Sequence, residues 1–153
     1  MEEKKRKGKG GLEASVGISG TVEIVVRDKN GKVKFRRLIT NAVTTAGKAY
    51  IASLLAQGGT ADNWNYIGIG NGSSEYHRKS GSVSYSSGST SFTVSATFSG
   101  YSGTQTINKA WLYKDSSSTA VSGAYAEASV SPEVTADWDA GDSLTITWTI
   151  TIS

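Results

Sequence analysis

The chain has 153 residues, which suffices for one hydrophobic core, and its 18 glycines against 1 proline are typical of short strands joined by turns. It contains no cysteine, which excludes disulfide bonds and thiolate metal sites. Its formal net charge is +3. No apolar run approaches the roughly 20 residues of a membrane helix, and the polar first residues lack the apolar segment of a signal peptide. We therefore expect a protein that is made in the cytoplasm and has no membrane partner.

Residues 1–11 carry all of the net charge, with five basic and two acidic side chains. They are glycine-rich and lack apolar anchors, which predicts an extended basic arm ahead of a β domain at residues 12–153. The arm's charges suit either phosphate groups or an acidic protein surface. We favour a protein surface over nucleic acid, because the rest of the chain is neutral overall and shows no platform of aromatic and basic residues. The candidate partner-binding residues of the arm are Lys4, Lys5, Arg6, Lys7 and Lys9.

Alternation of apolar and polar residues predicts strands at 13–19, 21–28 and 32–40. Asn30-Gly31 predicts a hairpin between the last two, because a type I′ turn requires positive φ at both central residues. The outer face of this hairpin is basic, and its candidate partner-binding residues are Arg27, Lys34, Arg36 and Arg37. The last quarter of the chain, by contrast, holds acidic but no basic residues. The two surfaces can complement each other within one fold or between copies.

One short helix is predicted at about residues 45–57, because a threonine can cap its start, apolar residues recur at helical spacing and two glycines follow it. Residues 64–70 predict a strand whose glycines allow close approach of another backbone. Residues 73–88 predict a polar loop with a short strand at 83–85. Further strands are predicted at 91–99, 104–114, 120–130 and 143–153. Seven to nine strands with one helix predict a mainly β fold, either a two-sheet antiparallel β-sandwich or a jelly roll.

Little in the sequence points to catalysis. His77 is the sole histidine, and we expect it in a solvated loop without the positioned partner that a catalytic base requires. Asp137, Asp139 and Asp142 surround a glycine and are weak candidates for calcium ligands, but no glutamate closes a loop of about 12 residues. Aspartate and glycine are also ordinary turn residues. We therefore expect no enzyme activity, no metal site and no cofactor.

The four tryptophans fall into two predicted classes. Trp111 and Trp148 occupy inward-facing strand positions with Tyr113, and we assign them to the core. Trp64 and Trp138 lie at predicted loop edges, where we expect contact with a ligand or another subunit. Together with exposed tyrosines they would also suit sugar stacking, so a carbohydrate-binding module is an alternative function.

Three segments carry a family resemblance: NAVTTAGKAYI at 41–51, YIGIGNG at 66–72 and AGDSLTITWTITI at 140–152. In this order they resemble segments of small virion structural proteins of tailed bacteriophages and related viruses. The segment INKAWLY at 107–113 adds to the likeness. It departs from the family pattern at Lys109 and Trp111, which replace the usual acidic residue and glycine. The resemblance covers residues 38–153 and leaves out the basic arm.

This resemblance implies a virion structural protein without catalytic residues, and a capsid decoration (cement) protein is the form we favour. We expect a homo-oligomer, with a trimer as the leading form, that binds the major capsid protein or another virion protein through the arm and through contacts between copies. A tail-fibre or baseplate component that binds a receptor or another tail protein is the alternative. The expected location is the virion, after synthesis in the host cytoplasm.

Overall fold

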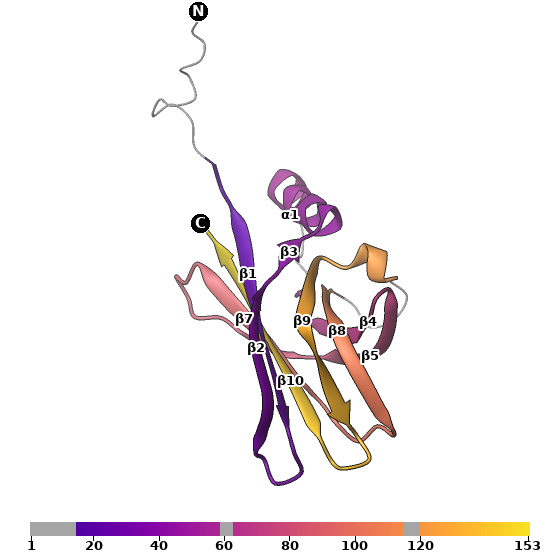
Figure 1. The fold of residues 1–153 in the computed structure, drawn as a ribbon. Coiled ribbons are helices and arrows are strands. Elements are labelled where there is room, and N and C mark those ends of the chain that lie inside the picture. The colour runs from indigo at the N-terminus through magenta and orange to yellow at the C-terminus, as the bar shows by residue number, and fades with distance from the viewer. Residues whose placement is uncertain (1–14, 59–62, 115–119) are drawn as a thin grey trace, which may run out of the picture.

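The computed structural model describes residues 15–58, 63–114 and 120–153, which form two packed antiparallel sheets of five strands each (Figure 1). The predicted mainly β, two-sheet sandwich is therefore confirmed. The first sheet contains, in spatial order, β2 (Val33–Thr40), β1 (Ile18–Arg27), β10 (Ser143–Ile152), β7 (Ser91–Phe98) and β6 (Ser82–Ser84). The second contains β3 (Ala42–Val43), β9 (Ala126–Asp137), β8 (Thr104–Tyr113), β4 (Tyr66–Asn71) and β5 (Ser74–Ser80).

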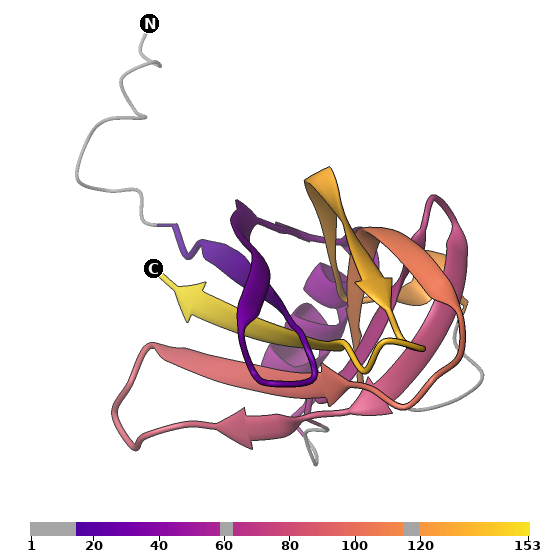
Figure 2. The same ribbon diagram turned by 60° about the horizontal axis from the view of Figure 1, so that its bottom comes forward.

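The helix α1 (Thr45–Gln57) matches the predicted range, and a short 3-10 helix occupies Val121–Gly123. Figure 1 shows α1 at the same end of the sandwich as the start of β1 and the end of β10, whereas Figure 2 brings forward the opposite end, where the β1–β2 and β9–β10 turns lie. No helix in the described part of the chain is long and apolar enough to span a membrane. The predicted arm at residues 1–11, with all five of its basic residues, lies outside the described residues.

Strand β10 forms the centre of the first sheet, because it pairs with β1 on one side and with β7 on the other. Its apolar residues Leu144, Ile146, Trp148 and Ile150 are buried in the core, as the alternation predicted. Successive side chains of a strand point to opposite faces, so the apolar residues of β10 lie on one face and its threonines on the other. Trp148 is buried in this core, as predicted. Trp111 and Tyr113 are buried as well, but in a second, smaller cluster with Ala124, on the opposite face of β8 from the core residues Ala110 and Leu112.

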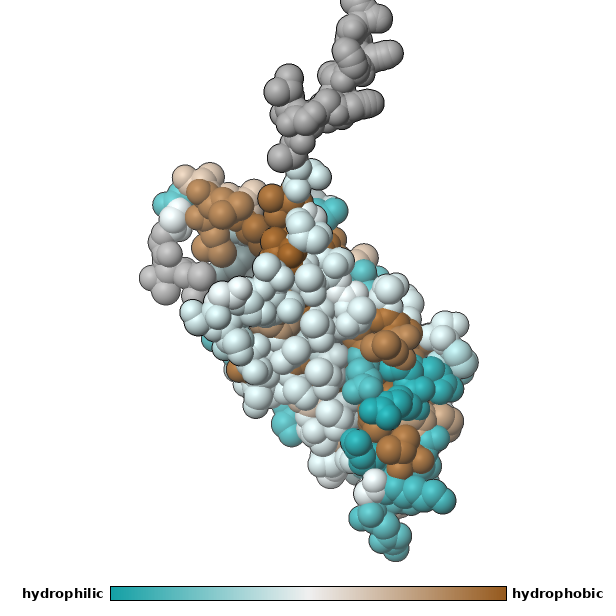
Figure 3. All heavy atoms as spheres, turned by 90° about the vertical axis from the view of Figure 1, so that its left-hand side faces the viewer, coloured by the Kyte–Doolittle hydropathy of each residue, from teal (hydrophilic) through white to brown (hydrophobic). Residues whose placement is uncertain are grey.

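The outer face of the first sheet is covered by hydroxyl side chains. Thr145 of β10 lies opposite Thr97 of β7, with 2.9 Å between their hydroxyl oxygens, and Thr147 lies opposite Ser95 at 3.3 Å. This face corresponds to the wide pale surface in Figure 3, which is neither strongly hydrophilic nor hydrophobic. The sheet is thus apolar inside and hydroxyl-rich outside.

The start of α1 is fixed by two contacts. The hydroxyl of Thr44 accepts a hydrogen bond from the backbone N–H of Gly47 at 3.1 Å, which caps the helix, and donates one to the carbonyl of Ala124. A Cβ atom at Gly47 would lie 2.3 Å from the carbonyl oxygen of Tyr125. The helix therefore approaches the chain before β9 at a distance that only glycine permits.

Three predicted boundaries are wrong. The strands expected at 13–19 and 21–28 form one continuous strand, β1, among the described residues. The strand expected at 120–130 begins at Ala126 and continues to Asp137. The polar loop expected at 73–88 contains a whole strand, β5, which pairs with β4 along its length. A Cβ at Gly70 would lie 2.0 Å from the carbonyl oxygen of Ser74, so glycine in β4 is what lets β5 pack so closely.

Gly47→Ala tests the contact at the start of α1. Alanine normally stabilises a helix interior relative to glycine by up to about 1 kcal/mol. Here we expect the opposite sign, a loss of about 1–3 kcal/mol in the free energy of unfolding, because the added methyl group meets the Tyr125 carbonyl. Urea denaturation measures this difference. Lys48→Ala, at the next and exposed helix position, is the control and should change stability by less than about 0.5 kcal/mol.

Candidate functional site

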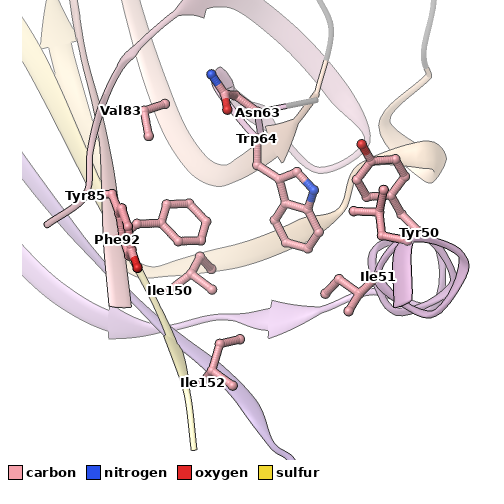
Figure 4. A pocket seen from close by; sticks show the side chains of 10 residues that line it. Tyr50, Ile51, Asn63, Trp64, Val83, Tyr85, Phe92, Ile150 and Ile152 are labelled. Atoms are coloured by element: carbon pink, nitrogen blue, oxygen red, sulfur yellow. The ribbon is translucent and has the colours of Figure 1, made fainter. Parts of the chain in front are cut away.

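A pocket of about 410 Å³ opens at the α1 end of the sandwich. Its residues come from parts of the chain that are distant in sequence, and none of them is charged. In Figure 4, Tyr50 and Ile51 on the helix lie across the pocket from Phe92 and Tyr85, with Trp64 between them. The lining consists of Tyr50, Ile51, Leu54, Asn63, Trp64, Val83, Tyr85, Phe92, Ile150 and Ile152. Such an apolar hollow is suited to an apolar side chain or ligand.

An aromatic cluster supports one wall of this pocket. The Tyr50 ring stacks on Tyr125 with 5.0 Å between centroids, and Trp64 packs against Tyr125 at the same centroid distance. Tyr125 directly precedes β9, so the cluster joins α1 to the second sheet. Such ring pairs add about 0.5–1.5 kcal/mol beyond their buried area. The helix wall is therefore held in place by packing.

The rim of the pocket carries apolar side chains that face solvent. Tyr85 is 60% exposed, and Val83 and Ile152 are also exposed among the described residues. Val83 and Tyr85 lie at the short strand predicted at 83–85, which corresponds to β6, but nothing in the sequence indicated that this strand borders a pocket. The available signal was the alternation of β10, which places Ile152 on the same side of the strand as the core residues.

Trp64 and Trp138 do not form an exposed platform. Their side chains are 7% and 4% exposed, and the structure places them in the core cluster. Trp64 forms part of the pocket lining, whereas the indole N–H of Trp138 donates to Oε1 of Gln105 at 2.8 Å. The structure therefore does not bring these two tryptophans together in one surface.

His77 is on strand β5 and not in the predicted solvated loop. Its ring stacks on Tyr101 with 3.5 Å between centroids, and its Nε2 lies 2.8 Å from Oε1 of Gln105. Because that amide oxygen can only accept, Nε2 donates the hydrogen bond. Gln105 thus joins His77 and Trp138, and the histidine serves to hold the outer strand of the second sheet.

Glu75 and Arg78 of β5 form a second polar cluster, which lies beside Gly68 of β4. Arg78 makes two hydrogen bonds with Glu75, at 2.7 and 2.8 Å, while its guanidinium lies 3.5 Å from the centroid of the Tyr113 ring. Burial is the main cause that raises the pKa of Tyr113, so the phenol stays neutral. A Cβ at Gly68 would lie 2.0 Å from a Glu75 carboxylate oxygen, which explains why glycine stands there.

The basic residues predicted on the first hairpin lie on β1 and β2. Arg36 pairs with Glu23 at 2.9 Å, and Lys34 reaches Asp142 at 2.6 Å. Arg37 donates from Nη1 to the carbonyl of Arg36 at 3.0 Å, and Arg27 ends β1. The basic hairpin and the acidic C-terminal part therefore do meet within one fold, at Lys34 and Asp142.

Asp142 has a structural role in the β9–β10 turn. One of its oxygens accepts hydrogen bonds from Nζ of Lys34 and from the backbone N–H of Asp137, at 2.6 and 2.9 Å. Burial opposes ionisation, but these two hydrogen bonds outweigh it and hold the pKa of Asp142 below its usual range. No group of three histidine, aspartate or glutamate side chains in the described ranges is arranged to hold a metal ion. Asp137 and Asp139 thus gain no metal role from the geometry.

The comparisons with known proteins add no relative, because no family model, curated protein or solved structure matches the chain. The three segments that carry the resemblance lie at the start of α1, on β4 and on β10. They form the core and the close contacts between elements. The apolar pocket and the basic hairpin are therefore the two surfaces that bear on function.

Asp142→Asn tests the turn contact and predicts a pH dependence. A carboxylate with a lowered pKa stabilises the fold fully above its unfolded value, near pH 4, and this contribution is lost as the pH falls through the lower folded value. We therefore expect Asp142→Asn to have a lower free energy of unfolding than the parent protein at pH 7. The two free energies should approach each other as the pH falls below about 4. Guanidinium denaturation at several pH values measures this. Asp139→Asn, at an exposed position of the same turn, is the control, and an equal loss in both variants would contradict the assignment.

Proposed function

We propose that this chain is a virion structural protein, and specifically a capsid decoration protein that assembles from several copies and binds the particle lattice. The observation that carries the proposal is the uncharged apolar pocket with its exposed rim at the α1 end. Contiguous apolar surface of this kind is typical of a protein that is covered by another protein. Segments resembling phage virion proteins supply the assignment to a virion.

A second copy is the occupant that we assign to the pocket. The same rim holds a hollow and projecting apolar side chains, of which Tyr85 is the most exposed. A hollow beside projecting side chains can serve a two-fold contact, which requires self-complementarity, or the head-to-tail contacts of a trimer, in which the side chains of one copy enter the hollow of the next. The absence of charge in the lining removes the repulsion that two identical charged surfaces would meet.

The basic arm is the second part of the proposal. It would attach each copy to an acidic surface of the particle, and many weak contacts in one assembly add to a strong attachment. A tail-fibre or baseplate component would use the same surfaces on a different part of the virion. A carbohydrate-binding module gains no support from Trp64 and Trp138, because both indoles are buried.

Ile152→Asp tests the contact between copies. We expect the parent protein to form an oligomer by light scattering and the variant to associate at least about tenfold more weakly, since a charge would be placed on an apolar contact. Thr151→Asp is the control, because Thr151 lies on the opposite, hydroxyl-rich face of β10. A monomeric parent protein at all concentrations, or equal weakening by both variants, would contradict the interface.

Deletion of residues 1–11 tests the arm. We expect the shortened protein to keep its β-sheet circular dichroism and its oligomeric state but to lose co-sedimentation with purified particles. The physical reason is that the deletion removes five basic side chains and leaves the described sandwich whole. Unchanged co-sedimentation of the shortened protein would refute the attachment through the arm.

A further inference from the structure

One long strand edge of the sandwich is open. Strand β2 stands at the end of the first sheet and pairs only with β1 in the part of the chain that the structure describes. Open edges attract further strands, and proteins commonly block them with proline, bulges or charges. The other open edge nearby is that of β9 beyond β3, and it carries Pro132 and Glu133. The edge of β2 contains no proline and pairs with β1 in regular register from Phe35 to Thr40, with a bulge only near Val33. Its blocking device is therefore positive charge, which repels a basic strand but not an acidic one.

The hydrogen-bonding phase of β2 shows which groups point outward. The N–H of Asn41 donates to the carbonyl of Gly20 at 3.1 Å, so Asn41 is a hydrogen-bonded position of the antiparallel pair. Such positions recur at every second residue, and Ile39 and Arg37 therefore also direct their backbone groups toward β1. The backbone groups of Arg36 and Leu38 therefore point away from the sheet. The Arg36 carbonyl agrees with this phase, because it accepts from the Arg37 side chain.

Polar atoms without partners lie along this edge. The Nε of Arg37 and both side-chain polar atoms of Asn41 are buried and have no hydrogen-bond partner among the described residues. Leaving such a group buried and unpaired is unfavourable. Asn41 lines a shallow groove of about 650 Å³ between β2 and β9 that also includes Leu38, Ser129 and Glu127, whose carboxylate is neutralised by Lys109 at 2.7 Å. The Asn41 amide itself lies over Gly20 of β1, where an added Cβ would be 2.2 Å from its Oδ1, so the groove offers a docked chain its shape and not this amide.

The side chains of β2 define the chemistry of what fits. Arg36 is basic and its side chain is 62% exposed although it pairs with Glu23, and Lys34 is 37% exposed beside Asp142. Leu38, on the same face, is 72% exposed, and Val33 is also exposed, whereas Arg37 lies on the opposite face with Phe35 and Ile39. These hydrophilic and apolar patches alternate at the lower right of Figure 3. A segment with acidic residues beside apolar ones would complement both kinds of patch.

A second copy does not fit this edge. An antiparallel pair of two β2 strands would place the central Arg36 and Arg37 of one copy against those of the other, and like charges directly opposite are destabilising. The arm of another copy is basic as well. Charge complementarity thus selects a different, acidic protein.

We propose that β2 is a docking edge for an extended acidic segment of a partner protein, which adds to the first sheet as a sixth, antiparallel or parallel strand. The added strand would pair with the outward backbone groups of Arg36 and Leu38. This inference deepens the proposed function and rests on it only for the partner's identity as a virion protein. The chemistry of recognition follows from β2 itself.

The experiment uses a fluorescent probe peptide of alternating glutamate and valine, with a lysine–valine peptide as its charge-reversed counterpart. We expect the full chain to bind the glutamate peptide at low salt, and hydrogen exchange to slow at the amides of Arg36 and Leu38. Leu38→Pro removes an outward N–H that β1 does not use, and should weaken binding at least about tenfold. Leu38→Ala keeps that N–H and should retain most of the affinity.

Charge is tested separately. Arg36→Gln should weaken binding of the glutamate peptide several-fold, whereas Lys48→Gln, which removes the same charge from α1, should leave it unchanged. Equal binding of both peptides, protection at β5 or β6 in place of β2, or concentration-dependent protection of β2 without peptide would overturn the proposal. Peptide binding is measured without particles. A negative result in the particle assays would therefore count against the proposed function and not against docking at β2.

Discussion

The structure depends on the pairing of β10 with strands on both of its sides. This strand joins β1 from the start of the described chain to β7 from its middle, and its inward residues Leu144, Ile146 and Trp148 occupy the centre of the core. Burying such side chains contributes about 1.5–3 kcal/mol each. Because β10 is the central strand of five, with β1 and β7 as its neighbours, β2 and β6 are the two edge strands of this sheet. The open edge of β2 is thus a consequence of the topology.

The parts of the fold that the sequence predicted are those with a local signal. The alternation of β10 and the capping threonine of α1 each act within a few residues, and both were located correctly. Strand β5 lacked such a signal, because Glu75, His77 and Arg78 are polar although all three are partly buried, with His77 on one face of the strand and Arg78 on the other. They are stabilised by Tyr113, Tyr101 and Gln105, which are distant in sequence.

The same distinction explains the surfaces. The basic character of β2 could be predicted from composition alone, whereas the pairing of Lys34 with Asp142 required knowing that the β1–β2 and β9–β10 turns lie at one end. The apolar pocket was missed because its residues come from α1, β6, β7 and β10. Burial of Trp64 and Trp138 likewise follows from how distant segments pack, since each lies beside a turn in the sequence.

The pocket and the β2 edge differ in physical character, and this difference bears on assembly. Association through the uncharged pocket, as proposed, would depend on apolar burial, which salt does not screen, whereas the proposed recognition along β2 would depend on charges that are partly screened at physiological ionic strength. Contacts between copies would therefore persist at salt concentrations that release an acidic partner. A protein with both kinds of surface can form its own oligomer first and then bind its partner with many copies at once.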